Sequence, residues 1–219
     1  MHKNIEKLKF IKNKINEIIV EKQLKTNPQI IVITKTFPIE NIFPLLESGH
    51  VHYGENKIQE AENKWVTIRK KYKNLSLHMV GKLQSNKAKK AVDLFDYIHS
   101  LDNEKLAKAL SSHEKKINKK LKYFIQVNIG NEDQKSGISI NQLNDFYHFC
   151  NQLNLNIIGL MCIPPFDQNP EGYFKEMQSL KEKLNLKELS MGMSSDYLQA
   201  VDYSSTYLRI GSSIFGERF

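Results

Sequence analysis

The sequence predicts an α/β fold, a single-domain (β/α)8 TIM barrel that spans residues 1–219. Eight short apolar segments alternate with helical patterns along the chain, as expected when each strand is followed by a helix. The first and last of these segments have the apolar composition of buried strands. This fits a closed barrel better than an open sheet, whose two edge strands would be exposed. No run of Gly, Ser or Pro is long enough to separate two domains. We therefore expect one domain with short loops.

The individual elements follow from the spacing of apolar residues. Residues 1–27 are expected to carry a helix packed on the barrel, because apolar side chains recur at helical spacing between Lys3 and Lys25. The β-branched run Ile30–Thr34 reads as a strand covered on both faces. Further strands are expected at 50–53, 75–80, 95–99, 121–128, 156–161, 188–190 and 206–210. Helices are expected at 39–48, 57–72, 84–92, 103–117, 141–153, 171–184 and 195–202.

Composition excludes several classes of protein. With 40% hydrophobic and 26% charged residues, the chain is neither disordered nor membrane-spanning. The segment Met1–Phe10 is too charged for a signal peptide, so we expect a cytoplasmic protein. The net charge is +8, but only three of the 32 basic residues are Arg, which argues against specific nucleic-acid binding. Cys150 and Cys162 are too few and too far apart for a disulfide framework or a metal-binding pair, and they read as small hydrophobic residues.

Lys35 is the first candidate for chemistry. It follows the first strand directly and is in phase with Ile31 and Ile33, so it is expected at the barrel mouth where substrates bind. Apolar walls disfavour the ammonium form of a lysine, and an uncharged amine can attack a carbonyl. The alternative is a lysine that merely extends from a strand end into solvent.

Arg209 is the second candidate. It lies on the last strand, which neighbours the first in a closed barrel, so Arg209 and Lys35 are expected to share one mouth. A buried guanidinium needs a partner, and an ion pair with a core carboxylate is the alternative to a ligand-binding role.

Two loops suit an anionic group. Gly211-Ser212-Ser213 follows the last strand, and Met191–Asp196, which contains Ser194, follows the strand before it. The loops after strands seven and eight are a common phosphate site in barrels, because small residues let backbone N–H groups approach the ligand. Asn56 is placed by the turn after strand two, where it either faces the mouth or caps a helix. His50 and His52 share a face but have no third ligand, so no metal site is expected.

Seven sequence motifs together carry a family resemblance. They are Val32–Thr36 (VITKT), Tyr53–Asn56 (YGEN), Leu83–Lys87 (LQSNK), Gln126–Asn128 (QVN), Gly159–Met161 (GLM), Leu189–Ser194 (LSMGMS) and Arg209–Gly216 (RIGSSIFG). In this order they resemble the pyridoxal phosphate homeostasis protein family, from about residue 30 to residue 218. The chain departs from the family pattern in having Lys57 in place of an aromatic residue, Lys82 in place of Pro and Ser212 in place of Thr.

The resemblance implies a barrel of the alanine racemase N-terminal type that binds pyridoxal 5′-phosphate. It implies Lys35 as the internal aldimine, Arg209 facing the pyridine nitrogen, and phosphate binding by Ser194, Gly211 and Ser212. Asn56 and Met193 complete the cofactor-binding set, and no catalytic residue is assigned.

A guanidinium cannot accept a proton, so Arg209 would leave the pyridine nitrogen unprotonated and the ring a poor electron sink. We therefore interpret the protein as a monomeric, non-catalytic carrier in pyridoxal phosphate homeostasis, with pyridoxal-phosphate-dependent apoenzymes as partners. Two alternatives stay open: a weak amino-acid racemase that uses the same cofactor, and a class I aldolase-like enzyme whose Lys35 attacks its substrate directly.

Overall fold

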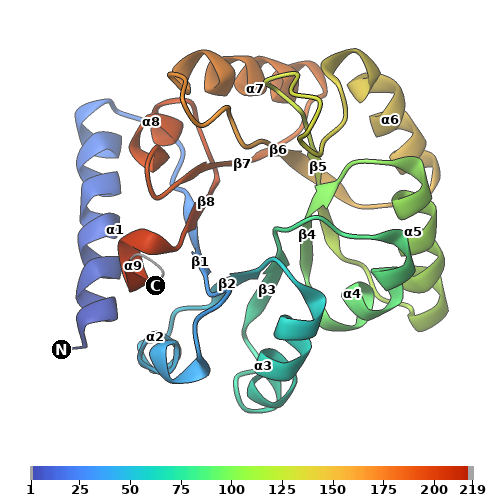
Figure 1. Cartoon of the computed structure of the whole chain (residues 1–219). Coiled ribbons are helices and arrows are strands. Elements are labelled where there is room, and N and C mark those ends of the chain that lie inside the picture. Colours follow the sequence, from blue (N-terminus) through green and yellow to red (C-terminus); the bar gives the residue numbers. More distant parts are fainter. Residues whose placement is uncertain (1, 217–219) are drawn as a thin grey trace.

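Eight parallel strands pair in sequence order, and β8 pairs back onto β1 to close a barrel. The computed structural model describes residues 2–216, and Figure 1 shows the helices arranged around the strands. The strands are β1 (Gln29–Ile33), β2 (His52–Glu55), β3 (Ser76–Met79), β4 (Tyr97–Leu101), β5 (Lys122–Gln126), β6 (Ile157–Met161), β7 (Glu188–Met193) and β8 (Tyr207–Ile210). The predicted fold class is confirmed.

One helix precedes the barrel and a helix follows every strand. The helices are α1 (Lys3–Glu21), α2 (Phe43–Glu47), α3 (Ile58–Lys71), α4 (Ala88–Leu94), α5 (Glu104–Ile117), α6 (Ile140–Gln152), α7 (Glu171–Lys183), α8 (Tyr197–Asp202) and α9 (Ser212–Phe215), with 3₁₀ turns η1 (Ile39–Asn41) and η2 (Ser85–Lys87). Helix α1 lies outside the barrel against α2, α8 and α9 (Figure 1). It ends at Glu21, so residues 22–28 form the connection to β1.

Both faces of the strands are covered, which explains the continuous apolar runs in the sequence. On β1, Ile31 and Ile33 belong to a small cluster inside the barrel, whereas Ile30 and Val32 belong to the larger cluster between barrel and helices. Alternate side chains of a strand point to opposite faces, so a strand enclosed by the barrel on one side and helices on the other has no polar face.

Strand β2 lies two residues later than predicted. The expected strand was 50–53, but the pairing joins His52 to Ser76 and Glu55 to Met79. Gly54 allows this register, because a Cβ at this position would lie 2.6 Å from the Ile33 side chain inside the barrel. Glu55 is consequently a buried strand residue and not part of a turn at the mouth.

Within residues 2–216, no helix combines the length and the apolar character needed to cross a bilayer.

Candidate functional site

Lys35 leaves the end of β1 at a sharp turn. The next residue, Thr36, has a φ of 69°, a left-handed conformation that is unfavourable for a β-branched residue. Its N–H donates to Glu60 Oε1 at 2.5 Å, which holds this conformation. Lys35 itself is half-buried. The turn therefore fixes the backbone from which the lysine side chain starts.

A second lysine, Lys64, stabilises this turn through hydrogen bonds. Lys64 on α3 donates to the Thr34 carbonyl at 2.8 Å, to Glu55 Oε1 at 2.9 Å and to Glu60 Oε1 at 3.0 Å. Glu55 is fully buried and also accepts from Thr34 Oγ1 at 2.6 Å and from Trp65 Nε1 at 2.9 Å. This ion pair ties β1, β2 and α3 together beneath Lys35.

Six of the seven predicted cofactor-binding residues line one cavity of about 630 Å³ at the carboxyl ends of the strands. They are Lys35, Met193, Ser194, Arg209, Gly211 and Ser212. The seventh, Asn56, lies outside it and lines an adjoining cavity of about 370 Å³ that shares Lys35. The structure thus brings the two predicted cations to one mouth.

Arg209 is buried inside the barrel, with 5% of its surface exposed. Its Nη1 donates to the Ser190 carbonyl at 2.7 Å and to Ser190 Oγ at 2.8 Å, and its Nη2 donates to the Cys162 carbonyl at 2.8 Å. Within residues 2–216 no carboxylate forms a salt bridge with it. The alternative of an ion pair with a core carboxylate is therefore wrong for the described chain, and neutral oxygens hold the charge.

A chain of three imidazoles, two of them buried and the third half-buried, continues from Arg209 through the barrel. Ser190 Oγ lies 2.8 Å from His99 Nδ1, His99 Nε2 lies 2.9 Å from His78 Nδ1, and His78 Nε2 lies 3.0 Å from His52 Nδ1. His78 and His99 are both fully buried. Stacking supports the two rings, because His78 lies 4.2 Å from the ring of Tyr97 and His99 lies 4.2 Å from the ring of Phe124.

The positive charge of Arg209 gives this chain a direction. Since Ser190 Oγ accepts from Arg209, its own O–H is available to donate to His99 Nδ1. His99 then donates from Nε2 to His78, and His78 donates from Nε2 to His52. The opposite direction would turn the positive ends of these dipoles toward the guanidinium. We therefore assign neutral imidazoles with the proton on Nε2.

Ser194 joins the two loops that the sequence predicts for an anion. Its Oγ accepts from the N–H groups of Gly211 and Ser213, each at 3.3 Å. Ser213 Oγ donates in return to the Ser194 carbonyl at 3.4 Å. Two backbone N–H groups and several hydroxyls therefore converge on one side of the Lys35–Arg209 cavity.

The donor set of this cavity fits pyridoxal 5′-phosphate. It offers a primary amine, a guanidinium, serine hydroxyls and apolar walls that include Ile33 and Val80, and none of its described lining residues is Asp or Glu. An amine suits a carbonyl, and N–H and O–H donors suit a phosphate.

Among residues 2–216 there is no cluster of His, Cys, Asp or Glu suited to a metal ion. Cys162 is buried, which raises the pKa of its thiol to about 12.

The residues that support the site were not identified from the sequence. Lys64 lies in a helix with many other charges. Ser190 and His78 each lie between two apolar residues, whereas His99 is followed by Ser100. One signal was available in the sequence. A polar residue between two apolar neighbours in a buried strand, as in Leu77-His78-Met79, needs a buried hydrogen-bond partner.

Comparison with known proteins places the chain in a family. The model of the alanine racemase N-terminal domain matches residues 11–218. A protein from Pasteurella multocida named pyridoxal phosphate homeostasis protein is 37% identical over 201 residues, which cover 87% of this chain and 86% of the relative. A protein of the same name from Aquifex aeolicus is 36% identical over 84% of this chain and 85% of its own length.

Solved structures show the same architecture. PipY from Synechococcus elongatus PCC7942, solved with PLP bound, has a TM-score of 0.79 and 33% identity, and the match covers 92% of this chain and all (100%) of that one. Alanine racemase from Acinetobacter baumannii has a TM-score of 0.72 over 94% of this chain and 60% of the racemase, but at 13% identity it supports the fold alone.

The ion pair beneath Lys35 is expected to contribute strongly to stability. Lys64→Met would leave the Glu55 carboxylate buried without its cation, at a cost of about 3 to 5 kcal/mol in the free energy of unfolding. The matched control is Lys108→Met, because Lys108 pairs with Glu104 on the surface, where the side chains are 61% and 60% exposed. That change should cost less than about 1 kcal/mol. Urea denaturation of both variants measures the difference, and equal small losses would show that Glu55 does not depend on Lys64.

The buried histidines are expected to make the fold acid-sensitive. Burial lowers the pKa of His50 from 6.5 to about 4, and burial is also the main cause that lowers the pKa values of His52, His78 and His99. Between pH 6.5 and pH 4 the unfolded chain therefore binds protons that the folded chain does not, so the free energy of unfolding falls as the pH is lowered.

Thermal denaturation at a series of pH values measures this effect. His50→Gln retains a donor for the His52 carbonyl and should reduce the pH dependence by about one proton. A melting temperature that stays constant across this interval would contradict the neutral state that we assign to the imidazole chain.

Proposed function

This chain belongs to the pyridoxal phosphate homeostasis protein family, and on that premise we propose that it is a non-catalytic carrier that binds pyridoxal 5′-phosphate in the Lys35–Arg209 cavity. The observation that carries the proposal is the convergence of Lys35 and Arg209 on one cavity whose described lining residues include no Asp or Glu. PipY, a relative whose structure contains PLP, supports the same ligand.

Lys35 is the residue that we propose to hold the cofactor covalently. When bound, pyridoxal 5′-phosphate supplies an aldehyde that condenses with a primary amine and a ring that withdraws electrons. The turn at Thr36 and the contacts of Lys64 fix the backbone on both sides of Lys35. Ser194, Gly211 and Ser212 line the same cavity and are suited to bind the phosphate.

Arg209 is the reason for proposing a carrier and not an enzyme. Its guanidinium already donates to three oxygens and has only N–H donors, so it cannot accept a hydrogen bond from a protonated pyridine nitrogen. An unprotonated ring is a weaker electron sink, which disfavours chemistry at the α-carbon of an amino acid. Racemisation also needs acid–base groups on both faces of a substrate, and Lys35 supplies one.

We also propose that the chain acts as a monomer and delivers the cofactor to pyridoxal-phosphate-dependent apoenzymes. A weak racemase remains the second candidate, because alanine racemases share this barrel.

Replacement of Lys35 tests the covalent attachment. Lys35→Ala should abolish the visible absorption of the lysine-bound cofactor, whereas Lys89→Ala, a change on the exposed side of α4, should leave it intact. Borohydride reduction of the loaded wild-type protein, followed by peptide mapping, should recover the cofactor on the peptide that contains Lys35. Recovery mainly on Lys82 or Lys135 would contradict this assignment.

Replacement of Arg209 separates carrier from enzyme. Arg209→Glu places an acid beside the ring nitrogen, which should strengthen the electron sink and permit slow transamination with added amino acids. The wild type should show almost none when the two proteins are compared at equal cofactor occupancy. Fast amino-acid turnover by the wild type that is lost in Lys35→Ala would overturn the carrier in favour of the racemase.

A further inference from the structure

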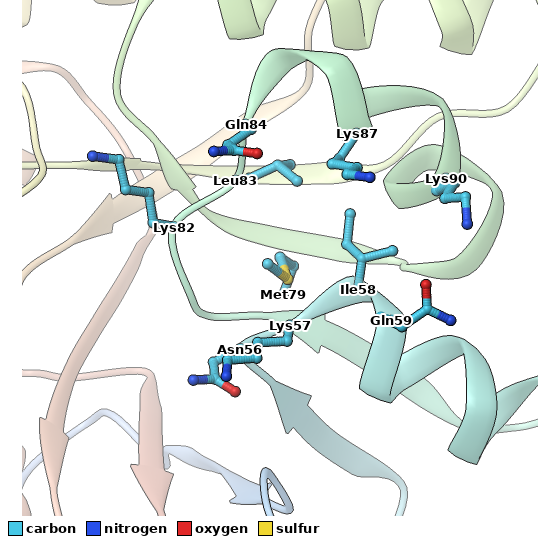
Figure 2. Close-up of a pocket in the computed structure, with 10 residues that line it drawn as sticks. All are labelled: Asn56, Lys57, Ile58, Gln59, Met79, Lys82, Leu83, Gln84, Lys87 and Lys90. Atoms are coloured by element: carbon cyan, nitrogen blue, oxygen red, sulfur yellow. The ribbon is translucent and has the colours of Figure 1, made fainter.

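A third cavity, also of about 370 Å³, lies beside the barrel mouth between the start of α3 and the loop that leads into α4. Four lysines line it: Lys57, Lys82, Lys87 and Lys90. No Asp or Glu is among its described lining residues. Figure 2 shows Lys87 and Lys90 on one side of the cavity, with Lys82 extending from the opposite end of the loop.

One of the four lysines around this cavity is neutralised by a salt bridge within the described chain. Lys90 forms a salt bridge with Glu62 at 2.8 Å, but no salt bridge of Lys57, Lys82 or Lys87 occurs within residues 2–216. Like charges around one concave surface repel each other and focus a positive potential in it. A bound anion relieves this repulsion.

The floor of the cavity is apolar. Ile58, Met79 and Leu83 are 8%, 1% and 4% exposed, and Figure 2 shows their side chains converging between the two loops. Gln59 and Gln84 add amide groups at the rim. A simple inorganic anion would leave the apolar floor unused, and an uncharged apolar molecule would leave the lysines unpaired.

We propose that this lysine-lined cavity binds a phosphomonoester carried on a single small ring. The ring would cover Ile58, Met79 and Leu83, and the phosphate would interact with Lys57 and Lys87. The volume suits one such ring, since ligand cavities begin at about 300 Å³.

The cavity connects to the Lys35 site. Asn56 and Lys82 line both the lysine-lined cavity and the cavity beside it, and that cavity in turn shares Lys35. The two loops meet at Gly81, where a Cβ would lie 2.3 Å from the Asn56 carbonyl oxygen. The Asn56 Oδ1 atom is buried there without a hydrogen-bond partner. If the proposed function holds, the lysine-lined cavity is a waiting position for a cofactor molecule on its way to or from Lys35.

The test uses pyridoxine 5′-phosphate, which has no aldehyde and cannot react with a lysine. Wild-type protein is loaded with pyridoxal 5′-phosphate and reduced with borohydride, so that the first site stays filled, and is then titrated by isothermal calorimetry. We expect one saturable site per chain. Binding should be at least tenfold weaker for pyridoxine and for inorganic phosphate, because each lacks one of the two recognised parts.

The variants locate this second site. Lys57→Gln combined with Lys87→Gln should weaken binding by about tenfold or more. Lys70→Gln combined with Lys89→Gln is the matched control, because it removes the same two charges, one from α3 and one from α4, at positions that do not line the cavity. Equal losses in the control and in the cavity variant would show nonspecific attraction to a basic surface and overturn the proposal, as would tighter binding of a nucleoside monophosphate.

The two proposals fail in different ways. If the visible absorption band of the lysine-bound cofactor is absent, only the proposed function is contradicted. Pyridoxine 5′-phosphate does not react with Lys35, so its binding still tests the lysine-lined cavity. If no reduced adduct forms, the same titration is made on unmodified protein, with Ser194→Ala marking the first site and Lys87→Gln the second. Binding that responds to Ser194→Ala but not to Lys87→Gln rules out the lysine-lined cavity.

Discussion

A guanidinium held inside a barrel by neutral oxygens constrains much of the structure around it. Arg209 is 5% exposed, and its charge is shared by the carbonyls of Ser190 and Cys162 and by the Ser190 hydroxyl. Burial is the main cause that lowers the pKa of Arg209, but a guanidinium in a protein stays charged. The compensation must therefore come from oriented dipoles. The chain from Ser190 through His99 to His78 supplies them, and it has to remain neutral to do so.

This constraint also explains the unusual filling of the barrel. Branched aliphatic side chains commonly fill such barrels, whereas here His78, His99, Tyr97, Phe124 and Tyr207 lie together as rings. Imidazoles can pass hydrogen bonds along the axis while their faces stack on aromatic neighbours. A polar line can thus run through the interior without leaving buried donors unpaired.

The sequence predicted the parts of this protein that local pattern determines. The β-branched run at Ile30 marked β1, and the phase of Lys35 with Ile33 placed the lysine at the mouth, in the cavity shared with Arg209. The start of β2 was misplaced because alternation in His50–Tyr53 resembles a strand, while the true register depends on Gly54 fitting against Ile33 across the sheet. Such a contact is set by the neighbouring strand and leaves no local signal.

The residues that support the site were not predicted for the same reason: their contacts join elements that are distant in the sequence. The loops at the barrel mouth give a further example. His78 and His99 become partners only when β3 and β4 close into the barrel, and Lys64 meets Glu55 only when α3 packs on β2. Lys57 and Lys82, noted in the sequence as two separate departures from the family pattern, prove to line one cavity. Gly81 brings their loops together, since any side chain at that position would collide with Asn56. Because the two loops pack closely at Gly81, Lys57 and Lys82 both add positive charge to the same cavity at the barrel mouth.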